Sequence, residues 1–272
     1  MTNKLKLISI GAIILAIIYS LLGYIVRINM FYYPIYEKID LMPILTKVAY
    51  TDSDYLTILQ QTGINIPLVN ELKKTDTFIE DMLRFQQNYY KPLNVQTLAM
   101  NAITSWEKAL DEDGKVVPAF EIAPYKNGYI FLTKSTFTVN YRHGHAGLIV
   151  DDVHGKILES SEPFTDSSLF DAKYWEYFPT FKMMRPIGVS QDVLDEIAKY
   201  AITELTGKPY NLLNLKFTTA STQCALLPWQ AFKAFDIDID GDNGMIITPA
   251  DIAKSNSLEV MQIFGFDYKR VW

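Results

Sequence analysis

The chain has 272 residues, of which 49% are apolar and 21% charged, so it can bury one large core or two smaller ones. Lysine and arginine total 25 against 31 aspartate and glutamate, and the net charge of −6 argues against a nucleic-acid partner because polyanions repel an acidic protein. A single cysteine, Cys224, excludes an intrachain disulfide and any metal site built from several cysteines.

The first element along the chain is a long apolar stretch. Residues 7–26 carry no charge, and as a helix they would span about 30 Å, the thickness of a bilayer core. The stretch is longer than the apolar core of a signal peptide, and no small-residue cleavage motif follows it. We expect residues 1–27 to be a single-pass anchor in the cell membrane lipid bilayer, with Lys4 and Lys6 cytoplasmic and the rest of the chain outside the cytoplasm. A cleaved signal sequence and a buried core helix are the alternatives.

Helical patterns dominate the next segment, residues 28–124, especially between residues 50 and 110. Thr51 can cap a helix that ends at Gly63, and Thr77 begins a capping-box pattern. Apolar and aromatic side chains follow Thr77 at helical spacing, which is typical of core packing. We therefore expect a helical segment ahead of the main domain.

From about Pro124 the pattern changes to short segments rich in β-branched and aromatic residues, which favour strands. The expected strands are residues 129–135, 145–151, 156–161, 181–186 and 258–264. Expected helices cover residues 190–207 and about 223–235, and a capped turn lies at Thr248-Pro249. The sequence therefore predicts an α+β domain with an antiparallel sheet over residues 125–272.

Cys224 lies where a polar stretch, residues 221–223, meets an apolar helical one. The thiol is therefore expected at the first turn of a helix, where the helix dipole and free backbone N–H groups stabilise a thiolate. The same N–H groups can receive an oxyanion in acyl transfer. The alternative is a small buried side chain without chemistry, as many lone cysteines are.

Two histidines precede the second expected strand, and strand alternation puts His143 and His145 on one face. If residues 151 and 155 close the next turn, paired residue numbers sum to 306. Gly147 then faces Glu159, and His145 lies diagonal to Glu159 on the same face. A carboxylate in that place fixes the tautomer of the imidazole and stabilises the imidazolium. The alternative is a solvated Glu159 beside a hydrogen-bonded structural His145.

Two patterns resemble metal sites but fail in detail. Residues 236–241 copy the start of an EF-hand calcium loop, but Ile247 stands where a bidentate glutamate is needed. His143 and His145 could form a zinc pair, but no third ligand has suitable spacing. We therefore expect no metal.

Several motifs stand in a characteristic order along the chain. They are Arg142–Val150 with its Gly-His-x-Gly core, Leu158-Glu159, Gly207-x-Pro209-Tyr210, Thr222–Ala225, the aspartate-rich residues 238–244, and Thr248-Pro249-x-Asp251-Ile252. In this order they resemble the YiiX/YebB-like branch of the NlpC/p60 cysteine hydrolases, over roughly residues 125–265. The helical stretch 51–90 resembles the front segment of some bacterial members. The resemblance implies a circularly permuted papain-like fold, with the histidine ahead of the cysteine.

The resemblance also implies a cysteine hydrolase of the peptidase or amidase type, which cleaves amide or ester bonds and needs no cofactor. It assigns Cys224 as nucleophile, His145 as base, and Glu159 as the residue that orients the imidazole. Substrate and oxyanion support would come from Gln223, His143 and Tyr210. Candidate substrates are cell-wall peptides and lipid-linked acyl groups.

Pro228 departs from the family pattern. It lacks an N–H, and its ring presses on the carbonyl four residues back, that of Cys224. The helix is therefore expected to start late or to kink beside the thiol. Two alternatives to a hydrolase stay open: a weak or inactive papain-like binding module at the membrane surface, and a cysteine acyltransferase that passes the acyl group to an amine or alcohol.

Overall fold

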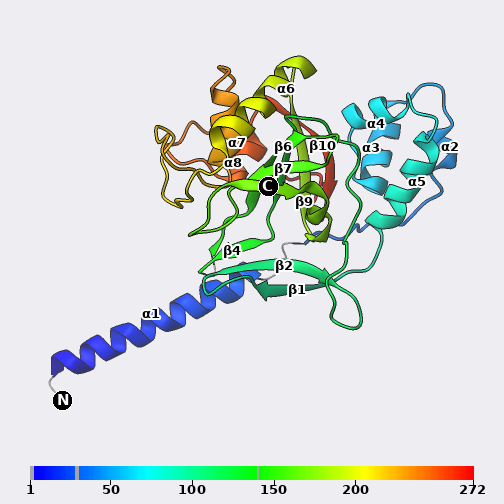
Figure 1. Cartoon of the computed structure of the whole chain (residues 1–272). Coiled ribbons are helices and arrows are strands. Elements are labelled where there is room, and N and C mark those ends of the chain that lie inside the picture. Colours follow the sequence, from blue (N-terminus) through cyan, green and yellow to red (C-terminus); the bar gives the residue numbers. More distant parts are fainter. Residues whose placement is uncertain (1–2, 28–30, 140) are drawn as a thin grey trace.

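The computed structural model describes residues 3–27, 31–139 and 141–272, and within the first helix it describes the side chains of residues 9–21. Helices combine with two antiparallel sheets, which confirms the predicted α+β class (Figure 1). The larger sheet lies at the centre of the body in Figure 1, and the short helices of residues 42–89 lie to one side of it.

In the described part of the chain, the central sheet has six strands in the order β10-β9-β3-β6-β7-β8. The strands are β3 (Ile130–Thr133), β6 (His145–Asp151), β7 (Lys156–Glu159), β8 (Ser168–Asp171), β9 (Phe181–Pro186) and β10 (Leu258–Phe264). Five of them match the predicted strands to within two residues at each end, and β8 was not expected. Strands β3 and β6 are buried along nearly their whole length, so they form the centre of the core.

The second sheet, of four strands among the described residues, has the order β1-β2-β4-β5. Its strands are β1 (Asn94–Ala99), β2 (Thr104–Leu110), β4 (Thr136–Thr138) and β5 (Tyr141–Arg142). The expectation of helix is therefore wrong for residues 94–110. Strand β2 pairs with its neighbour β1 along its length and also with β4, which lies beyond residue 124, so strand pairing outweighs the local helical pattern. This sheet joins the front segment to the domain that follows it.

The helices that precede the first strand in the sequence agree better with the predicted start and stop positions than residues 94–110 do. They are α2 (Met42–Leu45), α3 (Asp52–Thr62), α4 (Ile66–Leu72) and α5 (Phe78–Tyr89). Thr51 forms a capping box at the start of α3, and Gly63 ends that helix with a left-handed backbone, as expected. Thr77 precedes α5, but its hydroxyl donates to Asp81, so the expected capping box does not form there.

Helices from the second half of the chain surround the central sheet. They are the 3₁₀ helix η1 (Ala172–Tyr177), α6 (Gln191–Tyr200) with its π-helical extension η2 (Ala201–Leu205), α7 (Leu226–Lys233) and α8 (Pro249–Lys254). Helix α7 begins two residues after Cys224, so the thiol lies in the turn before the helix and not in its first turn. The late start expected from Pro228 is confirmed. Pro228 occupies the third helical position, where a missing N–H removes no intrahelical bond.

Helix α1 (Asn3–Arg27) projects away from the body in Figure 1. Large apolar side chains between Ile10 and Leu21 are exposed along it. The hydroxyl of Tyr19 donates to the carbonyl of Val139 at 3.2 Å, which attaches the helix to the second sheet. Among the residues that the structure describes, no helix combines the length and the apolar character needed to cross a membrane.

Candidate active site around Cys224

Cys224 lies in the turn that leads into α7, and the residue is 4% exposed. The chain enters this turn from a short parallel bridge between Tyr210 and Thr222. The N–H of Asn211 donates to the carbonyl of Thr222 at 2.8 Å, which closes the intervening loop at its base. The thiol therefore stands between a closed loop and the start of a helix, two features that limit its movement.

The side chain of Gln223 holds this turn in shape. Its Oε1 accepts a hydrogen bond from the N–H of Ala225 at 2.8 Å, and its Nε2 donates to the carbonyl of Ile247 at 2.6 Å. Reversing the amide would lose both bonds, so the network fixes its orientation. The Cys224 thiol donates to the same Oε1 at 3.4 Å. In this geometry Gln223 presents an acceptor to the thiol, and its amide group positions the turn.

The register of the β6–β7 hairpin brings His145 to Glu159. The pairs nearest the site are Leu148–Leu158 and Ile149–Ile157, whose numbers sum to 306 as predicted, and the register shifts by one residue only nearer the turn. His145 and Glu159 therefore share a face of the sheet. Their side chains meet with 2.6 Å between Nε2 and Oε2, which confirms the diagonal contact predicted from the sequence.

Glu159 is fully buried, and three groups donate to its carboxylate. Besides His145, these are the hydroxyl of Tyr174 and the indole N–H of Trp175, the latter at 2.6 Å from Oε1. Both aromatic residues belong to η1, which packs beside the strand. A buried carboxylate with this many donors has a fixed position and orientation. Glu159 can therefore hold the imidazole of His145 in one tautomer.

Aromatic rings hold His145 from the side as well. The rings of Trp175 and Trp106 stack against the imidazole, with centroid distances of 5.4 Å and 6.0 Å. Glu159 occupies Nε2, so Nδ1 is the nitrogen that can serve Cys224. Burial lowers the pKa of His145, but the charge of Glu159 and hydrogen bonds with Cys224 and Glu159 outweigh burial and raise that pKa to about 9.

The pKa of the Cys224 thiol is shifted in the opposite direction. Burial raises its pKa, but hydrogen bonds and positive charge from His143 and His145 lower it from 9.0 to about 6. Neutral pH lies above the cysteine value and below the histidine value. The two shifts favour a thiolate beside an imidazolium, which is the reactive form of a cysteine nucleophile.

His143 contributes the second imidazole beside the thiol. Its Nδ1 lies 2.5 Å from the carbonyl oxygen of Gly144, which can only accept, so Nδ1 carries the proton. Its Nε2 lies 2.9 Å from the hydroxyl of Thr138. The chain between His143 and His145 passes from β5 to β6 through Gly144, whose φ is +77°, so the two histidines do not lie on one continuous strand. Both imidazoles nevertheless lower the pKa of Cys224.

Tyr210 completes the group. Burial raises the pKa of Tyr210 well above its usual value. The negative charge of Cys224 adds to this shift, so the hydroxyl of Tyr210 interacts electrostatically with the thiol group. The structure therefore brings together all the site residues suggested by the sequence, namely Cys224, His145, Glu159, Gln223, His143 and Tyr210.

The second sheet adds site residues that the sequence analysis missed. Trp106 and Lys108 alternate on β2, and Trp106 covers His145. The ammonium of Lys108 lies 3.5 Å from the ring centroid of Phe178 and 5.5 Å from that of Tyr174. Burial lowers the pKa of Lys108 to about 7, and the nearby charge of Glu159 opposes that shift. The alternation of residues 104, 106 and 108 was the available indication of a strand, but the surrounding pattern favoured a helix.

A cavity of about 340 Å³ borders the site. Its lining residues are Met100, Trp106, Ser161, Glu162, Thr165, Asp166, Ser168, Phe170 and Tyr174. Trp106 stacks on His145, Tyr174 donates to Glu159, and the carbonyl of Thr165 accepts from the N–H of Tyr210 at 3.0 Å. Three of the lining residues, Trp106, Tyr174 and Thr165, therefore each contact a residue of the site directly.

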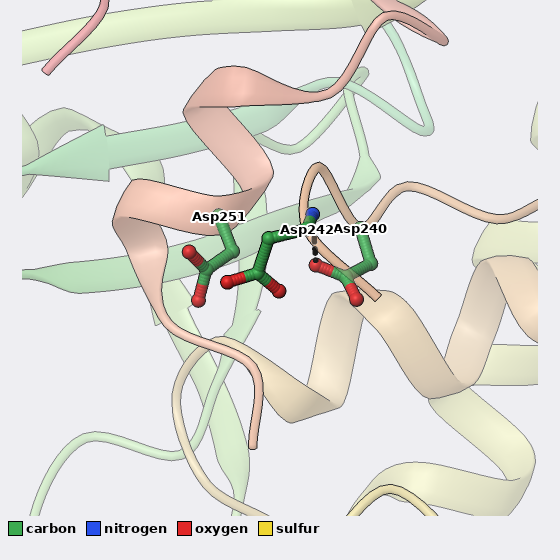
Figure 2. Close-up of side chains that lie close together, drawn as sticks. All are labelled: Asp240, Asp242 and Asp251. Carbon is green, nitrogen blue, oxygen red and sulfur yellow. Dashed lines mark hydrogen bonds between the residues drawn. The ribbon is translucent and has the colours of Figure 1, made fainter. Parts of the chain in front are cut away.

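An acidic cluster elsewhere contains the residues most able to bind a cation. Figure 2 shows Asp240, Asp242 and Asp251, each of which places one carboxylate oxygen within 4.8 Å of those of the other two. Asp240 forms an ion pair with Lys216, and Asp251 accepts from Thr248 as part of a capping box. These carboxylates therefore already stabilise the loop before α8, and Lys216 balances part of their charge.

No family model and no curated protein matches the chain. Among solved structures, the chain is similar to the metalloprotein yiiX from Escherichia coli O157:H7, with 11% sequence identity and a TM-score of 0.42. The match covers 51% of this chain and 97% of that one.

Proposed function

We propose that this protein is a cysteine hydrolase that cleaves amide or ester bonds of acyl substrates, in a permuted papain-like domain of the NlpC/p60 type. The observation that carries the proposal is the arrangement in which the His145 imidazole lowers the pKa of the Cys224 thiol and itself lies 2.6 Å, through Nε2, from the buried Glu159 carboxylate. A nucleophile, a base and a residue that orients the base are the parts that acyl transfer by cysteine requires.

In the first step the Cys224 thiolate attacks the acyl carbon, and a carbon–sulfur bond forms as the carbonyl electrons move to oxygen. The backbone N–H of Cys224 has no hydrogen-bond partner among the described residues, and it lies just ahead of the α7 N-terminus. It can therefore donate to the oxyanion. The His145 imidazolium then gives its Nδ1 proton to the leaving nitrogen or oxygen, and the bond from the acyl carbon to that atom breaks.

In the second step a water molecule attacks the thioester, and His145 takes one of its protons. The carbon–sulfur bond breaks, the acid leaves, and the thiolate–imidazolium pair is restored. Glu159 keeps its hydrogen bond to Nε2 throughout, so the ring stays oriented and its positive charge stays stabilised.

We also propose that residues 7–26 attach the chain to the cell membrane and that the catalytic domain lies outside the cytoplasm. The exposed apolar side chains between Ile10 and Leu21 support attachment to lipid, because a helix in water would bury such side chains. Expression of the full chain followed by membrane fractionation and protease protection tests this placement. Recovery of the chain in the soluble fraction would contradict it.

The catalytic proposal is tested by alkylating the full chain with iodoacetamide at a series of pH values. The rate should rise with a midpoint near pH 6, and it should vanish in Cys224→Ala. In His145→Ala the midpoint should move up toward the usual thiol range, because the strongest source of positive charge is lost. Acyl-coumarylamide hydrolysis should disappear in Cys224→Ala, while thermal unfolding shows that the fold remains.

A non-catalytic binding module is the second candidate, and the low exposure of Cys224 favours it. In that case alkylation would be slow at every pH below the ordinary cysteine range, and no acyl substrate would be cleaved. Transfer of the acyl group to an added amine, in preference to water, would instead identify an acyltransferase.

A further inference from the structure

A second cavity, of about 210 Å³, lies beside β9 and β10, whereas His145 and Glu159 belong to β6 and β7. Helices α3 and α8 and the tail that follows β10, residues 267–271, supply most of the remaining wall. This cavity shares no lining residue with the 340 Å³ cavity next to Trp106. It is therefore a separate feature from the candidate active site.

One buried lysine stands among the apolar residues of this wall. Lys182 is 3% exposed, and strand alternation puts it on the same face of β9 as Met184. Met184 pairs with Val260 of β10, and both residues line the cavity together with Leu258. Lys182 therefore brings a charge to a largely apolar wall.

The ammonium of Lys182 has few partners. Its Nζ donates to the carbonyl of Val271 at 2.5 Å, the one hydrogen bond that it forms with the described residues. Because an ammonium carries three N–H groups, two of them have no partner in the described part of the chain. Burial, and after it the positive charge of Lys134, lowers the pKa of Lys182 to about 8, and no described carboxylate offsets these effects. A buried charge without a counter-charge is unfavourable, so an anion beside Lys182 would be stabilised.

The mouth of the cavity adds positive charge. Lys269 and Arg270 line the cavity and are exposed, so the cavity reaches the surface. Asp267 is its one acidic lining residue, and 3.9 Å separates Oδ2 of Asp267 from Nε of Arg270. Three cationic side chains thus accompany one carboxylate, in a chain whose net charge is −6. This local excess of positive charge favours the entry of an anion.

We propose that this cavity binds a small organic carboxylate with a short apolar chain. The carboxylate accepts from the free N–H groups of Lys182, and the hydrocarbon packs against Met184 and Leu258. Inorganic phosphate suits the cavity less well, because it carries more charge and no apolar part, and Lys182 is the one buried cation in the lining. The proposal adds a ligand site to the molecule and does not depend on the hydrolase function.

The competing explanation is structural, because Lys182 also holds the tail through the carbonyl of Val271. If that were its whole role, loss of the ammonium would affect stability, and no carboxylate would bind beside it. Binding of small anions therefore separates the two explanations.

Isothermal titration calorimetry of the full chain with four probes tests the proposal. Hexanoate should bind at least about 10-fold more tightly than hexanamide, which lacks the charge, and than acetate, which lacks the chain. It should also bind more tightly than inorganic phosphate. Absence of hexanoate binding, equal affinity for hexanoate and either organic analogue, or tighter binding of phosphate would overturn the proposal.

Three variants locate the bound carboxylate. Lys182→Met keeps the length of the side chain without its charge and should weaken hexanoate binding at least about 10-fold. Arg270→Gln, at the exposed mouth, should weaken it by a smaller factor and leaves the buried bond to Val271 in place. Lys108→Met removes a buried lysine beside the candidate active site, so it is the matched control and should leave the affinity unchanged.

Thermal unfolding shows whether each variant is folded, and Arg270→Gln decides the question if Lys182→Met fails to fold. Unchanged hexanoate affinity in a folded Lys182→Met, or in Arg270→Gln where that variant decides, would overturn the proposal. Loss of affinity in Lys108→Met alone would place the carboxylate in the candidate active site and would overturn it as well. Neither result would bear on the reactivity of Cys224, which alkylation measures separately.

Discussion

The imidazole of His145 and the carboxylate of Glu159, fourteen positions apart in the chain, meet at 2.6 Å between Nε2 and Oε2 with both side chains buried. The contact depends on a hairpin register in which an even sum of paired numbers keeps both residues on one face. A slip by one residue would send Glu159 to the opposite face. Strand pairing therefore sets the position of the carboxylate that raises the pKa of His145.

Glu159→Gln tests how much of the reactivity depends on this carboxylate. Glutamine keeps the shape but removes the charge that raises the pKa of His145, so that pKa should fall from about 9. The imidazolium then loses its proton at lower pH, and the alkaline limb of kcat/KM should move to lower pH. Activity at pH 7 should fall at least about 10-fold. A pH series on the acyl-coumarylamide measures both effects.

The acidic limb of kcat/KM reflects loss of the Cys224 proton. Its midpoint should stay near pH 6 or rise slightly in Glu159→Gln. Glu196→Gln, on the exposed side of α6, is the control for removing a negative charge elsewhere. An alkaline limb that stays in place in Glu159→Gln would show that Glu159 does not govern the charge of His145.

A substitution at Gly147 tests the packing next to His145 and Glu159. A Cβ at this position would lie 2.7 Å from Cδ1 of Ile157, closer than real Cβ atoms approach, and 3.0 Å from Cγ of Glu159, a contact so tight that the carboxylate side chain has to shift. Gly147→Ala should therefore push Glu159 from its place, with a loss of about 1–3 kcal/mol of stability and reduced activity. Urea unfolding and acyl-amide hydrolysis measure the two losses.

Ile157→Val supplies the matched rescue, because it removes the Cδ1 atom that the new methyl group would meet. The double variant should recover part of the stability lost in Gly147→Ala. If Gly147→Ala were as stable and as active as wild type, the close approach of β6 and β7 side chains would have no role in holding the carboxylate.

The contact between His145 and Glu159 could be predicted from the sequence because it forms within one hairpin. The β6–β7 hairpin joins neighbouring segments, and its register follows from apolar alternation and turn position alone. Cys224 could be placed beside a helix start by the change from polar to apolar residues. The order of motifs then linked the thiol to His145, a relationship that local patterns cannot supply.

The second sheet could not be found in this way. Strands β1 and β2 lie in a segment whose pattern favours helix, and they become strands because they pair with each other and because β2 also pairs with β4 more than twenty residues later. Trp106, which covers His145, and Thr138, which bonds to His143, were missed for this reason. Short strands such as β5, with two residues, carry too little pattern to be recognised.

Pro228 is expected to be tolerated despite its place near the nucleophile. It occupies the third position of α7, where no intrahelical N–H bond is lost, so Pro228→Ala should change stability by less than about 1 kcal/mol. The alkylation rate of Cys224 should stay the same. Ala231→Pro, one turn further along, removes a bond inside the helix and should cost about 3 kcal/mol or more. A large change in Cys224 reactivity in Pro228→Ala would show that the proline shapes the thiol turn.

Lys108 offers a pH test of the second sheet, because its ammonium is buried among aromatic rings beside Glu159. Burial lowers its pKa from 10.5 to about 7 in the folded chain, so between these values the unfolded chain binds more protons at this residue. Its contribution to stability should therefore increase as pH rises from about 7 toward 10.5. Lys108→Met removes that contribution, so the stability advantage of the variant over wild type should be greatest near pH 7 and should shrink as pH rises. Urea unfolding of both proteins at pH 7, 8 and 9 measures the difference, and a gap that stays constant would mean that the folded chain does not disfavour the charged amine.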